Sequence, residues 1–105
     1  MGDRANVVMT DSDEKVVLYT HWSGYELPEI VKKAMIRGKN RWDDFQYFTR
    51  IVFSEMIQNS VLSETGFGIS STVHDGNDKI IKIDCNNQTI KVYDKPKVTF
   101  EDFVK

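Results

Sequence analysis

The sequence has little of what several classes of protein require. A single cysteine, Cys85, occurs among the 105 residues, so the chain cannot form an internal disulfide, which suits a reducing compartment. No apolar run approaches the roughly 20 residues of a membrane-spanning helix. The net charge of −2 provides no general attraction for nucleic acid. We therefore expect a cytoplasmic protein without membrane segments, for which nucleic acid is not the favoured partner.

Motifs for metal binding and nucleophilic catalysis are equally sparse. The histidines are His21 and His74, and no HxxxH, CxxC or complete EF-hand spacing occurs. Asp75-Gly-Asn-Asp78 resembles half of a calcium loop but lacks the distal glutamate, which favours an ordinary turn. Cys85 has no histidine close in sequence, and there is no GxSxG motif. The sequence therefore predicts no metal ion, no cofactor and no complete catalytic group.

What the sequence does contain is typical of one globular domain. The chain is 40% hydrophobic and 29% charged, and its 105 residues lie within the usual size of a single domain. We expect one α+β domain that spans residues 1–105.

Two segments near the start of the chain, residues 5–9 and 16–21, show the alternation of strands. Because residues 11–14 are polar, we expect an antiparallel hairpin in which Thr10 pairs with Lys15. This register places one set of side chains toward the core: Ala5, Val7, Met9, Val16, Leu18 and Trp22. The opposite face carries Arg4 beside His21, and also Val8, Val17 and Tyr19. That apolar group leaves open a homodimer contact or a cover formed by the C-terminal helix.

Two apolar stripes predict helices. The first consists of Leu27, Ile30, Val31, Ala34 and Met35, at helical spacing. We expect Pro28 to be its first residue and Gly38 to end it. Asp43 is expected to cap the second helix, which should end between Gln58 and Leu62. Its apolar face comprises Phe45, Phe48, Ile51, Val52, Phe53 and Met56.

The second half of the chain is mostly strand-like. Strands are expected at residues 67–73, 79–84 and 89–93, with a turn at residues 74–78. A two-residue Asn86-Asn87 turn would pair Ile83 with Ile90 and Lys82 with Lys91, because asparagine tolerates the left-handed conformation. Residues 99–103 predict a one-turn helix. The order ββααβββα groups the strands, so we expect an α+β fold in which two helices pack on one face of an antiparallel five-stranded sheet.

Polar and aromatic residues concentrate where the second strand leads into the first helix. His21, Trp22 and Tyr25 lie in this short stretch, and the hairpin register brings Arg4 beside His21. Such a group can bind a phosphate or carboxylate and offers a ring for stacking. Glu64 begins a glycine-containing loop that would lie nearby if the third strand pairs with the first hairpin. The alternative is structural, with Trp22 in the core and His21 simply exposed.

Four segments of the chain carry a distinctive combination of residues. They are Met1-Gly-Asp-Arg-Ala-Asn-Val7, Leu18-Tyr-Thr-His-Trp-Ser-Gly-Tyr-Glu-Leu-Pro28, Arg41-Trp-Asp-Asp44 and Glu64-Thr-Gly-Phe-Gly-Ile69. Together they resemble a family of short bacterial and phage proteins of unknown function. The resemblance implies a bacterial or phage-infected host. Because the function of the family is unknown, the resemblance implies no particular activity, but it directs attention to the corner of Arg4, His21 and Trp22.

Three functional hypotheses follow. The leading one is a small non-catalytic module that binds a protein or a small anionic ligand through Arg4, His21, Trp22, Tyr25 and Glu64. The first alternative is a small hydrolase or transferase with His21 as acid–base, which requires a carboxylate from Asp43, Asp44 or Glu64 within hydrogen-bond reach. The second alternative is nucleic-acid binding through the Lys82 and Lys91 hairpin. These two lysines belong to a stripe with Lys79, Lys95 and Lys97, and aspartates interrupt this stripe, which favours an ordinary solvated face. We expect a binding protein rather than an enzyme.

Overall fold

Six strands and three α-helices make up the described part of the chain, which comprises residues 3–73 and 79–105 of a computed structural model. The elements in order are β1 (Ala5–Asp11), β2 (Glu14–Thr20), α1 (Leu27–Arg37), a 3-10 turn η1 (Lys39–Arg41), α2 (Phe45–Ile57), β3 (Phe67–Ser70), β4 (Ile80–Asp84), β5 (Thr89–Val92), β6 (Val98–Thr99) and α3 (Phe100–Phe103). The α+β class is confirmed. The turn predicted at residues 74–78 lies outside the described residues.

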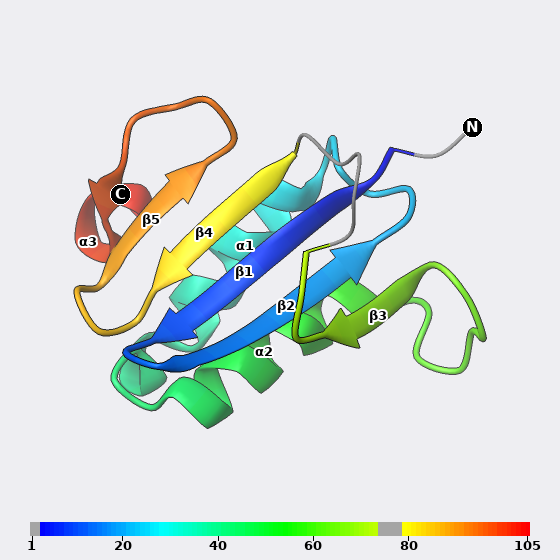
Figure 1. Cartoon of the computed structure of the whole chain (residues 1–105), viewed down its shortest axis with the longest axis horizontal. Helices are drawn as coiled ribbons and strands as arrows, with labels where there is room; N and C mark the ends of the chain where they lie inside the picture. Colours follow the sequence, from blue (N-terminus) through cyan, green and yellow to red (C-terminus); the bar gives the residue numbers. More distant parts are fainter. Residues whose placement is uncertain (1–2, 74–78) are drawn as a thin grey trace.

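The six strands form one mixed sheet in the order β3-β2-β1-β4-β5-β6 (Figure 1). Neighbouring strands are antiparallel except β1 and β4, which are parallel. The prediction of an antiparallel five-stranded sheet is therefore wrong in two respects, the parallel pair and the additional short strand β6. The physical reason is that strand propensity marks a segment as extended without specifying its neighbour, and β1 and β4 lie far apart in sequence.

The registers predicted for the two hairpins are confirmed. Thr10 lies opposite Lys15 in the first hairpin, and Lys82 lies opposite Lys91 in the second. The second turn differs in detail, because the residue with positive φ is Gln88 (φ 52°) rather than an asparagine. The Asp84 carboxylate explains this difference. It accepts hydrogen bonds from the backbone N–H groups of Asn86 (3.0 Å) and Asn87 (3.2 Å), so the turn winds around the carboxylate.

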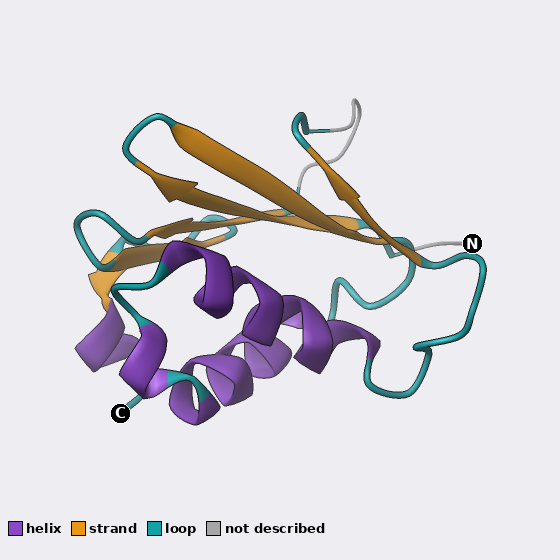
Figure 2. Cartoon of the chain, turned by 90° about the horizontal axis from the view of Figure 1, so that it is seen from below, coloured by secondary structure: helices purple, strands orange, loops and turns teal. Residues whose placement is uncertain are grey.

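Helices α1 and α2 both pack on one face of the sheet, here called the inner face (Figure 2). Of the predicted core residues, Ala5, Val7, Met9 and Leu18 are confirmed, since they have no exposed surface, whereas Val16 is partly buried and Trp22, at 48% exposed, is not in the core. The apolar stripes of both helices are also largely buried: Leu27, Val31, Ala34, Met35, Phe45, Phe48, Ile51, Val52 and Met56. Burial of these stripes is the main stabilisation of the fold.

The starts of both helices differ slightly from prediction. Helix α1 begins at Leu27, so Pro28 is not its first residue. The capping residue of α2 is Asp44 rather than Asp43, and its carboxylate accepts a hydrogen bond from the Tyr47 N–H (3.4 Å). Trp42 accounts for the later start of α2, because its buried indole N–H donates to the Met35 carbonyl (3.0 Å) and holds the preceding turn against α1.

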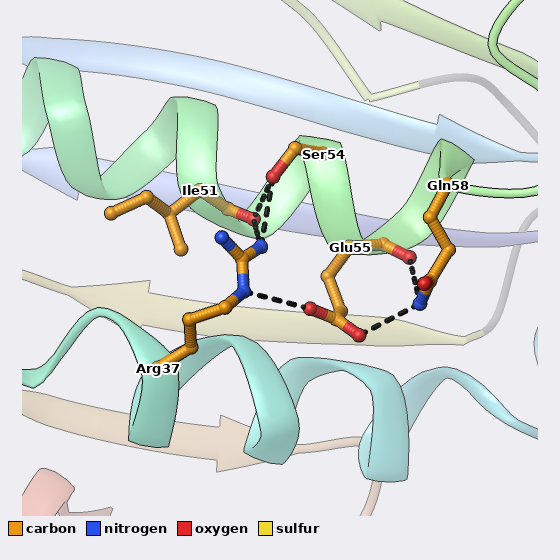
Figure 3. A network of polar contacts seen from close by, with 5 residues as sticks. All are labelled: Arg37, Ile51, Ser54, Glu55 and Gln58. Carbon is orange, nitrogen blue, oxygen red and sulfur yellow. Dashed lines mark hydrogen bonds and ion pairs between the residues drawn. The ribbon is translucent and has the colours of Figure 1, made fainter.

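A polar network joins α1 to α2 (Figure 3). The Arg37 guanidinium, at the end of α1, donates to the Glu55 carboxylate (3.1 Å), the Ser54 hydroxyl (2.9 Å) and the Ile51 carbonyl (3.1 Å). The side-chain amide of Gln58 donates to the other oxygen of Glu55 (2.8 Å). Each charged group of this clasp therefore has its partners within the network.

The C-terminal helix α3 closes the inner face rather than the outer one. Phe100 is buried and meets the rings of Trp42 and Phe48 edge-on, at centroid distances of 5.2 and 5.7 Å. The predicted cover of Val8 and Val17 by this helix is therefore wrong. Both valines are nevertheless buried, with 7% and 0% of their surface exposed, so they present no apolar patch for a dimer. The homodimer therefore stays a prediction from the sequence, and these two valines do not support it.

Candidate functional site

The predicted corner contains a row of aromatic rings. The Tyr19 hydroxyl lies 3.2 Å from Nδ1 of His21, directly beyond the end of β2. The His21 ring meets Trp22 edge-on at 5.8 Å, and Trp22 in turn meets Phe67 of β3 at 6.0 Å. Trp22 is 48% exposed, so it is neither a core residue nor a fully exposed one.

Gly66 allows this row to form. The backbone N–H of His21 donates to the Gly66 carbonyl (2.7 Å), which brings the loop before β3 against the corner, as expected from the sequence. A side chain at Gly66 would place its Cβ 2.3 Å from Trp22, and the φ of +100° is in the region that favours glycine. Trp22 therefore packs directly on the backbone of this loop.

Asp3 is the organising residue of the corner that the sequence did not reveal. Its carboxylate pairs with Lys79 and accepts a hydrogen bond from the Tyr25 N–H (2.6 Å), while its carbonyl accepts from the Gly24 N–H (2.8 Å). The hydrogen bond from Lys79 is the main cause that lowers the pKa of Asp3 below its usual range. A single aspartate before a strand has no pattern that would identify this role.

Tyr93 completes the same arrangement from the end of β5. Its hydroxyl donates to the Gly24 carbonyl at 2.5 Å. Burial, followed by the nearby charge of Asp3, raises the pKa of Tyr93 to about 12. The turn between β2 and α1 is thus held from both sides by Asp3 and Tyr93, which indicates a structural role for these two residues.

The side chains of the remaining residues predicted for the corner do not contribute to the contacts around His21, although the Tyr25 backbone N–H binds Asp3. Arg4, Tyr25 and Glu64 are exposed, and no hydrogen bond or ion pair within the described residues joins their side chains to His21. The strand ladder ends at Ala5 and Thr20, so it does not extend to the expected pair of Arg4 and His21. The corner therefore presents the half-exposed ring of Trp22, and no described ion pair or hydrogen bond joins it to the Arg4 guanidinium.

The carboxylates proposed for catalysis lie elsewhere. Asp43 and Asp44 line a shallow hollow with Asp11 and Glu14 at the tip of the first hairpin, whereas His21 follows the opposite end of β2. Within the described chain, the hydrogen bond of the His21 ring is to Tyr19, and no group of three or more potential ligands is placed to hold a metal ion. His74 and the turn Asp75–Asp78 lie outside the described residues.

Cys85 is not an activated nucleophile. The residue is buried, with 7% of its surface exposed. Burial raises the pKa of its thiol to about 12, and the charges of Asp11 and Asp84 act in the same direction. The thiol is therefore protonated at neutral pH.

A second candidate site lies on the outer face of the sheet, the face that α1 and α2 leave uncovered (Figure 2). A hollow of about 820 Å³ occupies this face over β1, β4 and β5. We call it the lysine hollow, and its lining residues are Val8, Thr10, Lys15, Val73, Ile80, Lys82, Asp84, Thr89, Lys91 and Lys97. The hairpin prediction placed Lys82 beside Lys91 and the predicted lysine stripe included Lys97, whereas Lys15 is added by the tertiary fold.

The strand register explains how the lining is assembled. Val8 on β1 lies opposite Val17 on β2 and opposite Lys82 on β4, and Lys82 lies opposite Lys91 on β5. Because side chains of directly paired residues point to the same face, one row across the sheet changes from valine to lysine. Lys97 directly precedes β6, at the far side of this row.

The charges of the lysine hollow are poorly balanced. Four lysines stand against one aspartate, a net lining charge of +3 in a chain of net charge −2. The one aspartate, Asp84, already accepts the hydrogen bonds of its turn. Lys91 donates to the Tyr93 carbonyl (2.6 Å), whereas Lys15, Lys82 and Lys97 have no hydrogen bond or ion pair with any described residue. The hollow is thus a local cationic surface on a weakly acidic protein.

A buried amide lies beside this hollow. Asn6 has no exposed surface, and neither its side-chain N–H₂ nor its side-chain carbonyl oxygen has a hydrogen-bond partner among the described residues. It precedes Val8 by two residues on the same face of β1 and lies opposite Ile80 on β4. Both Val8 and Ile80 line the hollow. An unpaired buried amide costs about 1–3 kcal/mol, so the outer face is not optimised for stability.

Comparisons of the chain with family models, with curated proteins and with solved structures find no match. The resemblance to short bacterial and phage proteins therefore stays a prediction from the sequence. No helix in the described residues is long and apolar enough to cross a membrane.

Proposed function

We propose that the protein is a non-catalytic module that binds a small anionic ligand in the lysine hollow. The observation that carries this proposal is the convergence of Lys15, Lys82 and Lys97, none of which has a described partner, around a concave surface. These lysines come from separate elements, so the cluster is a product of the fold and not of a local charge run.

The electrostatics of the hollow favour an anion. Lys82 and Lys91 lie directly opposite each other, and like charges in such a pair destabilise the sheet. A bound phosphate or carboxylate would relieve this repulsion and would accept hydrogen bonds from the ammonium groups. The same ligand would therefore stabilise the fold as it binds.

The size of the hollow suits a small molecule. Its volume of about 820 Å³ lies within the range of about 300–1,000 Å³ that is usual for ligand sites. A single-stranded nucleic acid would need aromatic side chains on which its bases stack. None of the described lining residues is aromatic, which favours a small anion over nucleic acid.

The residues of the hollow also favour binding without catalysis. The described lining contains no histidine, cysteine or tyrosine. His21 and Cys85, the two residues considered for chemistry from the sequence, do not line the hollow. The lysines and threonines that remain can hold an anion through charge and hydrogen bonds.

The test is a thermal-shift screen against sugar phosphates, nucleotides, pyrophosphate and dicarboxylates, followed by titration calorimetry of each hit. A ligand at 100 times its Kd should add about 2.7 kcal/mol to the free energy of unfolding. The double variant Lys82→Gln/Lys91→Gln should lose the hit, whereas Lys33→Gln, which removes one exposed charge on α1, should retain it. A hit that survives the double variant, or a screen without any hit, would contradict the proposal.

The aromatic corner is a second candidate for the same ligand class. The observation in its favour is Trp22, which is half-exposed and whose ring contacts that of His21. Gly24, two residues further along the chain, packs against Asp3 of the Asp3–Lys79 pair. A ligand that stacks a ring on Trp22 would direct its anionic group to Arg4 and His21, which are the residues that the sequence indicated.

Tryptophan fluorescence distinguishes the two candidates. Trp22 is 48% exposed and Trp42 is 5% exposed, so a ligand at the corner should change the emission of Trp22. Binding at the corner should also be weakened by Arg4→Ala and His21→Ala. A hit that leaves the emission unchanged and survives both substitutions belongs to the lysine hollow instead.

A further inference from the structure

We infer that the ligand of the lysine hollow is an amphiphile, an aliphatic chain that carries a single phosphate or carboxylate head group. This inference rests on the proposed function and adds the nature of the part of the ligand that is not anionic. Its basis is the division of the hollow into a cationic side and an aliphatic side.

The division runs across the sheet from β1 to β5 and along β4 from Ile80 to Lys82. The fourth lysine, Lys15, lies on β2 opposite Thr10, at the end of the hollow away from Ile80. The lysines Lys82 and Lys91 belong to β4 and β5, and Lys97 follows β5 in the chain. The apolar residues are Val8 on β1, Ile80 at the start of β4, and Val73 in the segment that follows β3. Adjacent strands are about 4.8 Å apart, so Val8 and Lys91 are separated by about 10 Å across the sheet. A head group over β4 and β5 therefore leaves an attached chain over Val8 and Ile80.

The apolar side is suited to an alkyl chain. Its residues, Val8, Val73 and Ile80, are all β-branched aliphatic side chains, and none of the described lining residues offers a ring for stacking. A nucleobase or an aromatic acid would thus bury its ring without an aromatic partner. An alkyl chain gains from burial alone, and about two buried methylene groups already correspond to about a tenfold gain in affinity.

The experiment compares the affinities of three phosphate compounds by titration calorimetry. The concentrations are kept below those at which the amphiphile aggregates. The probes are inorganic phosphate, octyl phosphate and adenosine monophosphate. We expect octyl phosphate to bind at least about tenfold more tightly than inorganic phosphate, and more tightly than the nucleotide. Failure of octyl phosphate to bind, or tighter binding of the nucleotide, would overturn the inference.

A valine variant with its control and the lysine double variant separate this inference from the proposed function. Val73→Ser should reduce the advantage of octyl phosphate over inorganic phosphate, whereas Val61→Ser, at a valine that is 62% exposed in the loop after α2, should not. Equal affinity for both probes, lost in Lys82→Gln/Lys91→Gln, would overturn the alkyl chain and leave the anion site standing. Octyl phosphate binding that survives the lysine variant would overturn both the inference and the proposed site.

Discussion

The two faces of the sheet differ in how their charged groups are paired. On the helix side, the Arg37 clasp supplies the guanidinium and the Glu55 carboxylate with partners, although the buried Thr49 hydroxyl of α2 has none among the described residues. On the outer face, the amide of Asn6 and the ammonium groups of Lys15, Lys82 and Lys97 have no partner within the described residues. The buried Asn6 amide without a partner costs stability, whereas water solvates the exposed ammonium groups of the three lysines. The comparison assigns most of the buried apolar packing to the inner face and leaves the outer face available for the ligand that we propose.

The largest expected effect tests the inner face. Phe100→Ala should lower the free energy of unfolding by about 3–5 kcal/mol, because it leaves a cavity against Trp42 and Phe48. Urea denaturation followed by circular dichroism measures this change. A loss below about 1 kcal/mol would show that α3 does not close the core and that the contrast between the faces is smaller than described.

The next effect has the opposite sign and tests the outer face. Asn6→Leu keeps the shape of the side chain and removes an unpaired buried amide. It should raise the free energy of unfolding by about 1–3 kcal/mol in the same urea experiment. Destabilisation would mean that the amide has a hydrogen-bond partner in solution. The description of Asn6 as an unpaired group of the outer face would then be wrong.

A smaller loss is expected at the clasp. Arg37→Ala removes the hydrogen bonds to Glu55, Ser54 and the Ile51 carbonyl. Because the Arg37 side chain is 50% exposed, solvent screens the ion pair and the expected loss is about 1 kcal/mol. The matched control is Arg50→Ala, an exposed arginine on the same pair of helices, which should change stability by less than about 0.5 kcal/mol. Equal losses in the two variants would show that the clasp contributes nothing specific.

The lysine row should respond in the opposite direction. Lys82→Gln removes the repulsion from the directly opposed Lys91 and should raise the free energy of unfolding by up to about 0.5 kcal/mol at low salt. The gain should shrink as salt is added, because salt screens exposed charges. A stability that falls at every salt concentration would show that Lys82 has a structural role rather than a binding role.

The last prediction concerns the dependence of stability on pH through Asp3, which holds the turn between β2 and α1. The pKa of Asp3 is lowered in the folded state, mainly by the hydrogen bond from Lys79, so this carboxylate contributes stability above its usual value of 3.8. That contribution is lost as the pH falls through the folded-state pKa. Asp3→Asn should therefore flatten the acid side of the stability curve, measured by urea midpoints between about pH 2 and 7. An unchanged acid side would show that the Asp3–Lys79 pair does not persist in solution.

Local features were predictable to the extent that local interactions decide them. The register of each hairpin follows from alternation and turn length, and both were correct for this reason. The apolar stripes of α1 and α2 likewise identified their buried faces. The first residue of each helix was less accessible, because the position of α2 depends on the buried contact of Trp42 with Met35, a contact between elements.

The candidate sites show the same division. The aromatic corner was predictable because His21, Trp22 and Tyr25 are neighbours in the chain, and the loop at Gly66 was an identifiable close approach. Asp3 was not, since its partners Gly24 and Lys79 come from segments far from it in sequence. Of the lysine hollow, the Lys82 and Lys91 pair and its neighbour in the stripe, Lys97, were predicted because they lie close together in the chain, whereas Lys15 comes from the distant strand β2.

The sequence by itself determined the helices, the two hairpins and the division of each into an apolar and a polar face, because these depend on periodicity over a few residues. Only the tertiary structure decided that β4 joins the sheet parallel to β1, and this pairing involves no local signal. That one pairing places Lys82 beside Val8 and so creates the boundary between cationic and aliphatic residues. The site proposed for the ligand therefore exists only in the folded chain.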